Sequence, residues 1–278
     1  MMRVRLVSEA APGRAENEDG ALHHGPLVGV FDGVTALPEV PSGCVHGPAW
    51  YVRRLTTRLA EVAAESPAAA LTDTLAEAIC RVNGDHGGRC DLANPATPAA
   101  TVCLVRADGD AVDFLILSDS TLVVERNGQV QVVTDDRFQQ AVAELRWGTV
   151  ADDVSPEERD AQQRRIDVRK HELTNRPGGY WVAAADPEAA YQAVTGRLPL
   201  GGRDGVRRAA LLTDGASCAV DDYGLMGWAE LLDLLTTRGP EELIRRVRAV
   251  ERADPDRAVY PRSKRHDDAT AAICVFGE

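Results

Sequence analysis

Four aspartates lie beside apolar runs or in tight turns, and they are spread over almost the whole chain. They occur in RAENEDG (Asp19), VGVFDGVT (Asp32), AALLTDGAS (Asp214) and RHDDATAAICVF (Asp267). A carboxylate at the end of a buried strand is costly unless a cation or a hydrogen-bond donor satisfies it. If these four positions converge, they form an all-oxygen site of the kind that Mg²⁺ and Mn²⁺ prefer. The pattern therefore predicts metal-assisted chemistry and favours phosphate as the group acted on.

The order and wording of the motifs resemble the metal-dependent protein phosphatases, the type 2C serine/threonine phosphatases. Arg14 precedes the pair Glu18-Asp19, one apolar strand ends in GVFDG, and a later strand ends in LLTDG. Between them, a threonine-containing strand AATVCLV leads to the turn LILSDST, and Asp267 opens the closing strand DDATAAICVF. The resemblance runs from about Arg14 to the C-terminus and depends on the joint occurrence of these short motifs in this order.

The resemblance also implies a role for each site residue. Two ions would be held by Asp19, Asp32, the carbonyl of Gly33, Asp214 and Asp267.

Three further residues complete the implied site. Glu18 would hold a metal-bound water, and Arg14 would grip phosphate oxygens through two parallel hydrogen bonds. Asp119, in the turn SDS, would help to hold a third and weaker ion. The implied reaction is direct attack on phosphorus by a hydroxide that bridges the two metals. The chain has no C-x5-R motif of a phosphatase that forms a phosphoenzyme.

Simpler interpretations of the same residues remain open. Asp19 and Asp119 also suit ordinary turns, and Asp-Gly is common where a strand leaves a sheet. Arg14 also fits a surface arginine paired with Glu16 or Glu18.

The two adjacent aspartates near the C-terminus compete for one role. The family pattern favours Asp267 as the metal ligand and gives Asp268 a supporting role.

Some positions depart from the family pattern. Val34 stands where many members have a histidine after Asp-Gly, so the usual general acid is missing. A metal-bound water is the favoured substitute, and His46 in CVHGPAW is a weaker one. Ser118 and Thr121 replace a glycine and a frequent arginine. The segment VTALPEVPSG, which contains two prolines, predicts a reshaped substrate entrance.

Composition limits the class of protein. The chain has 278 residues, 44% of them hydrophobic, with a net charge of −12. This charge argues against a nucleic-acid partner. The N-terminus lacks the apolar core of a signal peptide and no stretch is long enough for a membrane helix, so we expect a soluble cytoplasmic protein. The six cysteines form no C-x-x-C pair, and we interpret them as reduced core thiols.

Apolar patterning predicts the elements of an α+β protein. Strands are expected at 2–8, 27–31, 101–106, 112–117, 122–125, 129–134, 178–186, 207–213 and 269–276. Helices are expected at 48–64, 66–82, 155–170, 225–237 and 241–251. The resemblance sharpens this to a four-layer α-β-β-α sandwich with two central, mostly antiparallel sheets and a dinuclear metal site at one edge. We expect one catalytic domain over 1–278, with a flap-like insert at about 138–200.

Three functions fit these observations. The first is a Mg²⁺- or Mn²⁺-dependent phosphatase acting on phosphoserine or phosphothreonine in a partner protein. The second keeps the metal site but cleaves a small-molecule phosphate monoester, as the altered entrance suggests. The third is a regulatory binding module with little or no catalysis, which the intact set of four aspartates argues against.

Overall fold

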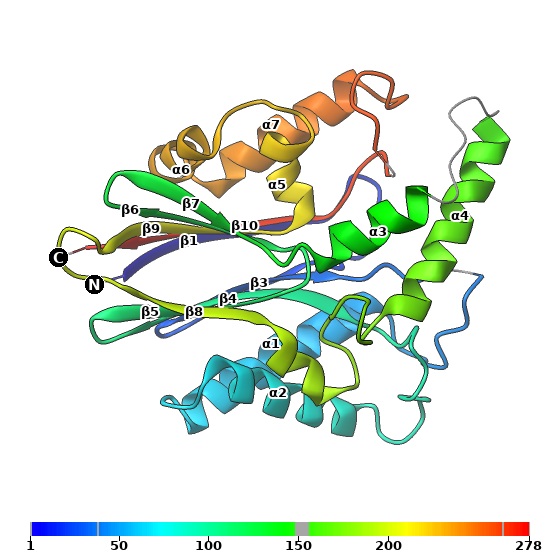
Figure 1. Ribbon diagram of the computed structural model, residues 1–278, viewed down its shortest axis with the longest axis horizontal. Coiled ribbons are helices and arrows are strands. Elements are labelled where there is room, and N and C mark those ends of the chain that lie inside the picture. Colours follow the sequence, from blue (N-terminus) through cyan, green and yellow to red (C-terminus); the bar gives the residue numbers. More distant parts are fainter. Residues whose placement is uncertain (1, 38, 148–155, 263, 278) are drawn as a thin grey trace.

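Two five-stranded antiparallel sheets face each other, and helices cover the outer face of each (Figure 1). The structure is a computed structural model that describes residues 2–37, 39–147, 156–262 and 264–277. This arrangement confirms the expected α-β-β-α sandwich. Within the described residues, no helix is long and apolar enough to cross a membrane.

The first sheet joins the two ends of the chain. Its strand order is β1-β10-β9-β6-β7. The strands are β1 (Met2–Glu9), β10 (Ala269–Phe276), β9 (Val206–Leu212), β6 (Thr121–Arg126) and β7 (Gln129–Val133). Its outer face carries α5 (Asp214–Asp221), α6 (Trp228–Thr237) and α7 (Pro240–Ala253).

The second sheet has the order β2-β3-β4-β5-β8. The strands are β2 (Gly20–His24), β3 (Leu27–Gly33), β4 (Ala100–Asp108), β5 (Ala111–Leu117) and β8 (Val194–Pro199). Its outer face is covered by α1 (Pro48–Glu65) and α2 (Leu71–Asp85), with the 3₁₀ helix η1 (Pro187–Gln192) against α2. Two more helices, α3 (Arg137–Trp147) and α4 (Pro156–Leu173), lie at one end of the sandwich.

The central strands are apolar on both faces because each sheet is covered on both sides. Val30 and Cys103 pack between the sheets, whereas Phe31 and Leu104 pack against the helices on the outer face. Each fully buried valine or leucine contributes roughly 1.5–3 kcal/mol through removal of apolar surface from water. This burial explains why the sequence of β3 reads as an unbroken apolar run up to Asp32.

Most strand predictions are confirmed. The N-terminal strand is an edge strand, and the four strands between residues 100 and 133 occur as expected. The β6–β7 hairpin turns at Asn127 and Gly128, whose φ values of 51° and 68° suit a type I′ turn. The closing strand spans the predicted residues, Ala269–Phe276.

Several boundaries and elements were predicted wrongly. Ser66 does not begin α2; its N–H donates to Val62 O and closes α1, and α2 begins only at Leu71. Residues 178–186 form no strand and contribute only two isolated bridges, Ala100–Ala183 and Thr174–Tyr180. The helix predicted at 155–170 is observed as α4 from Pro156, and residue 155 lies outside the described residues.

The sequence interpretation missed four elements. These are β2, α3, β8 and α5. The strands β2 and β8 lie at the two edges of the second sheet, where exposed and half-buried residues give a weak apolar signal. His23 and His24 belong to β2. Of the six cysteines, only Cys103, Cys218 and Cys274 are buried, so the core interpretation fails for Cys44, Cys80 and Cys90.

Candidate active site

The four aspartates predicted from the sequence gather at one edge of the sandwich because three strand ends meet there. Asp32 lies near the end of β3, Asp214 directly follows the Thr213 N-cap after β9, and Asp267 lies two residues before β10 begins at Ala269. Asp19 precedes β2, and its carboxylate accepts a hydrogen bond from Thr213 Oγ1 at 2.8 Å. This bond connects the N-terminal motif to the first sheet.

Asp268 holds the N-terminal loop against the start of β10. Its carboxylate oxygens accept from the N–H of Ala11 at 2.6 Å and from the N–H of Glu18 at 2.7 Å. The side chain is only 3% exposed. These contacts agree with the supporting position expected of Asp268 and leave Asp267 facing the other carboxylates.

Two glycines are required by close backbone contacts. A Cβ on Gly33 would lie 2.5 Å from Glu18 O, and the N–H of Gly33 donates to this same carbonyl at 3.1 Å. A Cβ on Gly215 would lie 1.9 Å from Asp268 O. A side chain does not fit at either distance. Glycine therefore follows Asp32 and Asp214 because the backbone of another motif lies against it, as well as because the strand ends there.

Burial and mutual repulsion perturb the carboxylates strongly. Burial is the main reason that the pKa of Asp19 rises to about 7. Burial, followed by the charges of Asp214 and Asp19, raises the pKa of Asp32 well above its usual range. Desolvation and the charges of Asp267 and Asp119 raise the pKa of Asp214 to about 8, even though its side chain is solvent-accessible. Excess negative charge is therefore concentrated at this edge.

One oxygen of this cluster has no polar partner among the described residues. Asp19 Oδ1 is buried and has no hydrogen-bond partner. An unpaired buried carboxylate oxygen among other carboxylates requires positive charge. Because the surrounding donors are all oxygens, they fit hard divalent ions such as Mg²⁺ and Mn²⁺.

Lys264 supplies part of the missing charge, and the sequence interpretation overlooked it. Its Nζ lies 2.9 Å from Asp267 and 3.3 Å from Thr35 Oγ1. Desolvation opposes its charged form, but the carboxylates of Asp267, Asp32 and Asp214 outweigh this effect and raise its pKa. The basic stretch PRSKRHDD before Asp267 was the available signal.

Arg14 and Glu18 form a pair at the margin of the carboxylates. Arg14 NH1 donates to Glu18 Oε2 at 2.6 Å, and Thr35 Oγ1 donates to this same oxygen at 2.8 Å. The guanidinium also lies 3.9 Å from Asp268 and remains about one-third exposed. It is thus tied to the motif while keeping donors accessible.

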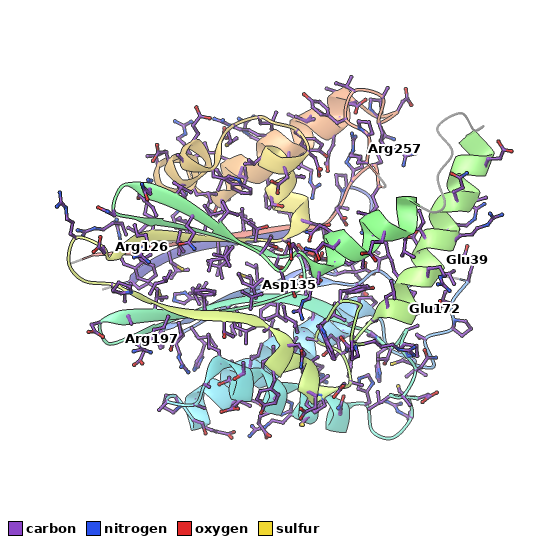
Figure 2. The ribbon with its side chains drawn as sticks, in the orientation of Figure 1. Glu39, Arg126, Asp135, Glu172, Arg197 and Arg257 are labelled. Atoms are coloured by element: carbon purple, nitrogen blue, oxygen red, sulfur yellow. The ribbon has the colours of Figure 1, made fainter. Side chains whose placement is uncertain are left out.

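Asp119 adjoins the site from the second sheet. It follows Ser118, whose positive φ of 69° is a backbone conformation that favours glycine. The N–H of Ser118 donates to Asp135, which is labelled near the start of α3 in Figure 2. Burial is the main cause of the raised pKa of Asp119, and the charge of Lys170 on α4 counteracts it. The helix α4 therefore contributes a cation close to this part of the site.

His46 does not approach the carboxylates as the substitute acid considered from the sequence. Its Nδ1 lies 3.5 Å from the sulfurs of Cys44 and Cys90, and its ring stacks on Trp50 with centroids 3.8 Å apart. The ring is therefore engaged by a separate group of side chains.

Comparisons with known proteins agree with this fold. The family model described as Protein phosphatase 2C matches residues 17–246. A comparison with curated protein sequences gives no match. Among solved structures, the PPM Ser-Thr phosphatase MsPP from Mycobacterium smegmatis has 20% identity and a TM-score of 0.58, covering 99% of this chain and 98% of that one.

Two further solved structures are similar. The Mycobacterium tuberculosis phosphatase PstP/Ppp has 17% identity and a TM-score of 0.57, covering 100% and 99% of the two chains. The catalytic domain of PstP, solved with two manganese ions, has 16% identity and a TM-score of 0.56, covering 99% and 97%. At these identities the likeness establishes the fold.

The fold and the carboxylate edge together define a metal-dependent protein phosphatase. Because the matched model spans most of its length, the chain belongs to the protein phosphatase 2C family.

Proposed function

We propose that this chain hydrolyses phosphoserine and phosphothreonine in proteins, using Mg²⁺ or Mn²⁺ held at the carboxylate edge. The observation that carries the proposal is the gathering of Asp19, Asp32 and Asp214 with raised pKa values around the unpaired Oδ1 of Asp19. Such a cluster ionises fully only when cations lie beside it.

The proposed metal-binding residues come from four segments of the chain. They are Asp19, Asp32, the Gly33 carbonyl, Asp214 and Asp267, with Asp119 at a weaker third position. When bound, the divalent ions supply charge neutralisation and an activated water for attack on phosphorus. Two ions are proposed because the family likeness includes a phosphatase crystallised with two manganese ions.

Arg14 is proposed to bind the phosphate. Its guanidinium is permanently charged and presents a fork that matches two phosphate oxygens. Glu18 holds one edge of this fork at 2.6 Å and keeps it beside the carboxylates. Glu18 would also accept a hydrogen bond from water at the site, as the family resemblance implies.

The whole chain is proposed to act as one catalytic domain, with α3 and α4 as a flap beside the site. Lys170 on α4 acts electrostatically on Asp119, which supports a position of α4 close to the proposed third ion. Phosphoprotein substrates would approach across this flap. A small-molecule phosphate is the second candidate, because the segment after Asp32-Gly33 forms part of the proposed substrate entrance. Two hydrogen bonds hold this segment in place, from Asp91 N to Gly43 O and from Asn94 Nδ2 to Pro41 O.

The test compares substrates under metal control. The purified chain is assayed on a phosphothreonine peptide, a phosphoprotein mixture and a panel of phosphorylated metabolites. We expect phosphopeptide and phosphoprotein hydrolysis to stop in excess chelator and to return with Mn²⁺ or Mg²⁺. Activity that persists in chelator would overturn the metal mechanism, and preference for one metabolite would establish the second candidate.

A further inference from the structure

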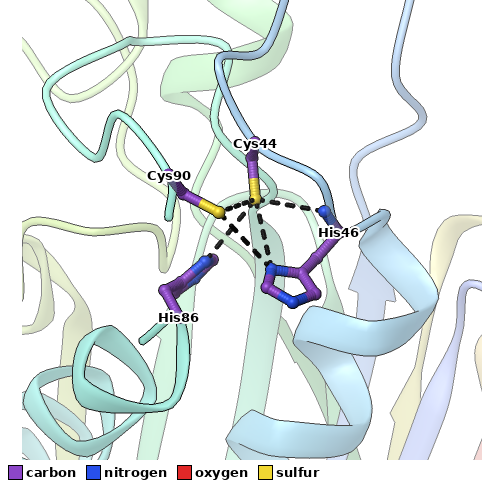
Figure 3. Close-up of side chains that lie close together, drawn as sticks. All are labelled: Cys44, His46, His86 and Cys90. Carbon is purple, nitrogen blue, oxygen red and sulfur yellow. Dashed lines mark hydrogen bonds between the residues drawn. The ribbon is translucent and has the colours of Figure 1, made fainter. Parts of the chain in front are cut away.

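A second group of metal-binding side chains lies away from the aspartates, at one end of the α1–α2 hairpin. Cys44 and His46 precede α1, while His86 caps α2 and Cys90 follows it (Figure 3). One ligand atom from each of the four lies within 4.8 Å of all the others. Neither the proposed phosphatase chemistry nor the core accounts for this group.

The distances within the group match one tetrahedral ion. Bonds of about 2.3 Å to sulfur and 2.0–2.1 Å to nitrogen separate the ligand atoms of a tetrahedral Zn²⁺ site by about 3.4–3.8 Å. Cys44 Sγ lies 3.5 Å from Nδ1 of both His46 and His86, and Cys90 Sγ lies 3.5 Å from Nδ1 of His46. The two sulfurs are 3.1 Å apart, slightly closer than such a site requires.

Contacts around the group hold the ligands in place. The N–H of His46 donates to Cys44 Sγ at 3.3 Å. Hydrogen bonds of this kind from neighbouring groups orient the side chains that bind a metal. Trp50 stacks on His46 and meets His86 edge-on, with ring centroids 3.8 and 4.7 Å apart. His86 is 2% exposed. The imidazoles are therefore fixed by packing, independently of any ion.

We propose that Cys44, His46, His86 and Cys90 bind one structural Zn²⁺. Two thiolates and two imidazoles form the donor set that Zn²⁺ takes in closed four-coordinate sites, and such donors disfavour Mg²⁺ and Mn²⁺. All four positions are filled by the protein, so no position is left for a substrate. The short pairs C-x-H and H-x3-C are brought together by the helical hairpin between them.

The zinc ion would anchor the segment that leaves the catalytic motif. This segment starts at Val34 after Asp32-Gly33 and reaches α1 at Pro48. His46 and Val34 line one cavity of about 30 Å³. The site therefore couples the end of α2 to the wall of the proposed active site. The zinc site itself does not depend on the proposed function, and only its effect on activity rests on that function.

The first experiment measures zinc in the purified full-length chain. The protein is prepared under reducing conditions and exchanged into excess Mg²⁺, so that ions at the carboxylates are replaced. We expect one zinc per chain in the wild type and background zinc in Cys44→Ser and Cys90→Ser. The matched control Cys80→Ser, an exposed cysteine on α2, and the carboxylate variant Asp214→Asn should both retain zinc.

Cobalt gives a reading that does not depend on whether a variant folds. Metal-free wild-type chain is titrated with Co²⁺, and we expect the visible bands of a tetrahedral ion together with sulfur-to-cobalt charge transfer. Addition of Zn²⁺ should abolish these bands. The Asp214→Asn variant should give the same bands, and its lack of phosphatase activity would show that the two centres are independent.

Three outcomes would overturn the zinc site. The first is wild-type protein that contains no zinc and gives no cobalt bands. The second is zinc that is lost in Asp214→Asn but kept in Cys90→Ser. The third is a Cys44–Cys90 disulfide found by mass spectrometry under reducing conditions. Loss of phosphatase activity alone bears only on the proposed function.

Discussion

The carboxylate edge and the Cys/His group of Cys44, His46, His86 and Cys90 are two centres built on opposite principles. The first collects carboxylate oxygens from distant parts of the chain at the strand ends, with Asp214 exposed and Asp19 buried. The second joins two short sequence pairs at the end of a helical hairpin, with His86 buried and the other three side chains partly exposed. Hard oxygens suit exchangeable ions that work on a substrate, whereas a closed set of soft ligands suits an ion that stays.

The two centres also differ in how their side chains are protonated when no ion is bound. Asp19, Asp32 and Asp214 repel one another and their pKa values rise as a result of burial and charge. In the Cys/His group, burial raises the pKa of Cys44 to about 11, so its thiol is neutral in the absence of an ion. The first centre therefore favours cations such as Lys264 beside it when its carboxylates are ionised, while the Cys44 thiol of the second stays neutral without an ion.

Substitution of Asp32 or Asp214 should give the largest difference between the two centres, because activity should fall while the zinc content stays the same. Asp32→Asn and Asp214→Asn should each lower kcat by more than ~10²-fold at saturating Mn²⁺, because charge is lost next to the reacting water. Zinc content should not change. Steady-state kinetics on an aryl phosphate measure the effect, with Asp204→Asn, an exposed loop aspartate, as the control. Wild-type turnover in Asp32→Asn would refute its assignment.

Substitution of Arg14 should affect substrate binding without affecting either centre. Arg14→Ala should raise KM by the equivalent of about 1.5–3 kcal/mol, the usual value of a hydrogen bond to a charged group. Extra Mn²⁺ should not rescue it, because guanidinium cannot bind the ions. Arg14→Lys, which keeps the charge but not the fork, should lie between. If calorimetry instead finds weaker metal binding at normal KM, Arg14 serves to organise Glu18.

The pH dependence of stability should distinguish the carboxylate edge from the Cys/His group. The pKa of Asp19 rises from the ordinary 3.8 to about 7, so the folded chain binds its proton more tightly than the unfolded chain. Metal-free protein should therefore lose stability as pH rises from about 4 to 7, and Mn²⁺ should raise Tm more at the upper end.

The control for this pH effect is Asp19→Asn, which removes the titrating group. Its metal-free Tm should vary less with pH than that of the wild type, with a difference of several degrees by calorimetry. Equal slopes in the two proteins would show that Asp19 is not the group responsible.

Asp119 should give the smallest effect. Asp119→Asn should reduce turnover only a few-fold at saturating metal and more at limiting metal, because the ion proposed beside it is the weakest held. A titration of activity against Mn²⁺ concentration measures both regimes. A loss as large as that of Asp214→Asn would place Asp119 among the main ligands.

The apolar runs made much of the fold predictable. The strands β3, β4, β9 and β10 are buried on both faces and read as continuous apolar segments, so their ends located three of the aspartates. The edge strand β8 alternates between half-buried and exposed residues and includes a glycine, so its pattern was too weak to find.

The sequence by itself determined which residues carry negative charge at strand ends, and their order identified the family. Only the tertiary structure decided that Lys264 also reaches Thr35, in the segment after Asp32-Gly33, and that Cys44 meets Cys90. Contacts of this kind join residues far apart along the chain or on unrelated loops. No local pattern encodes such contacts, because they arise when the packing of sheets and helices brings the loops together.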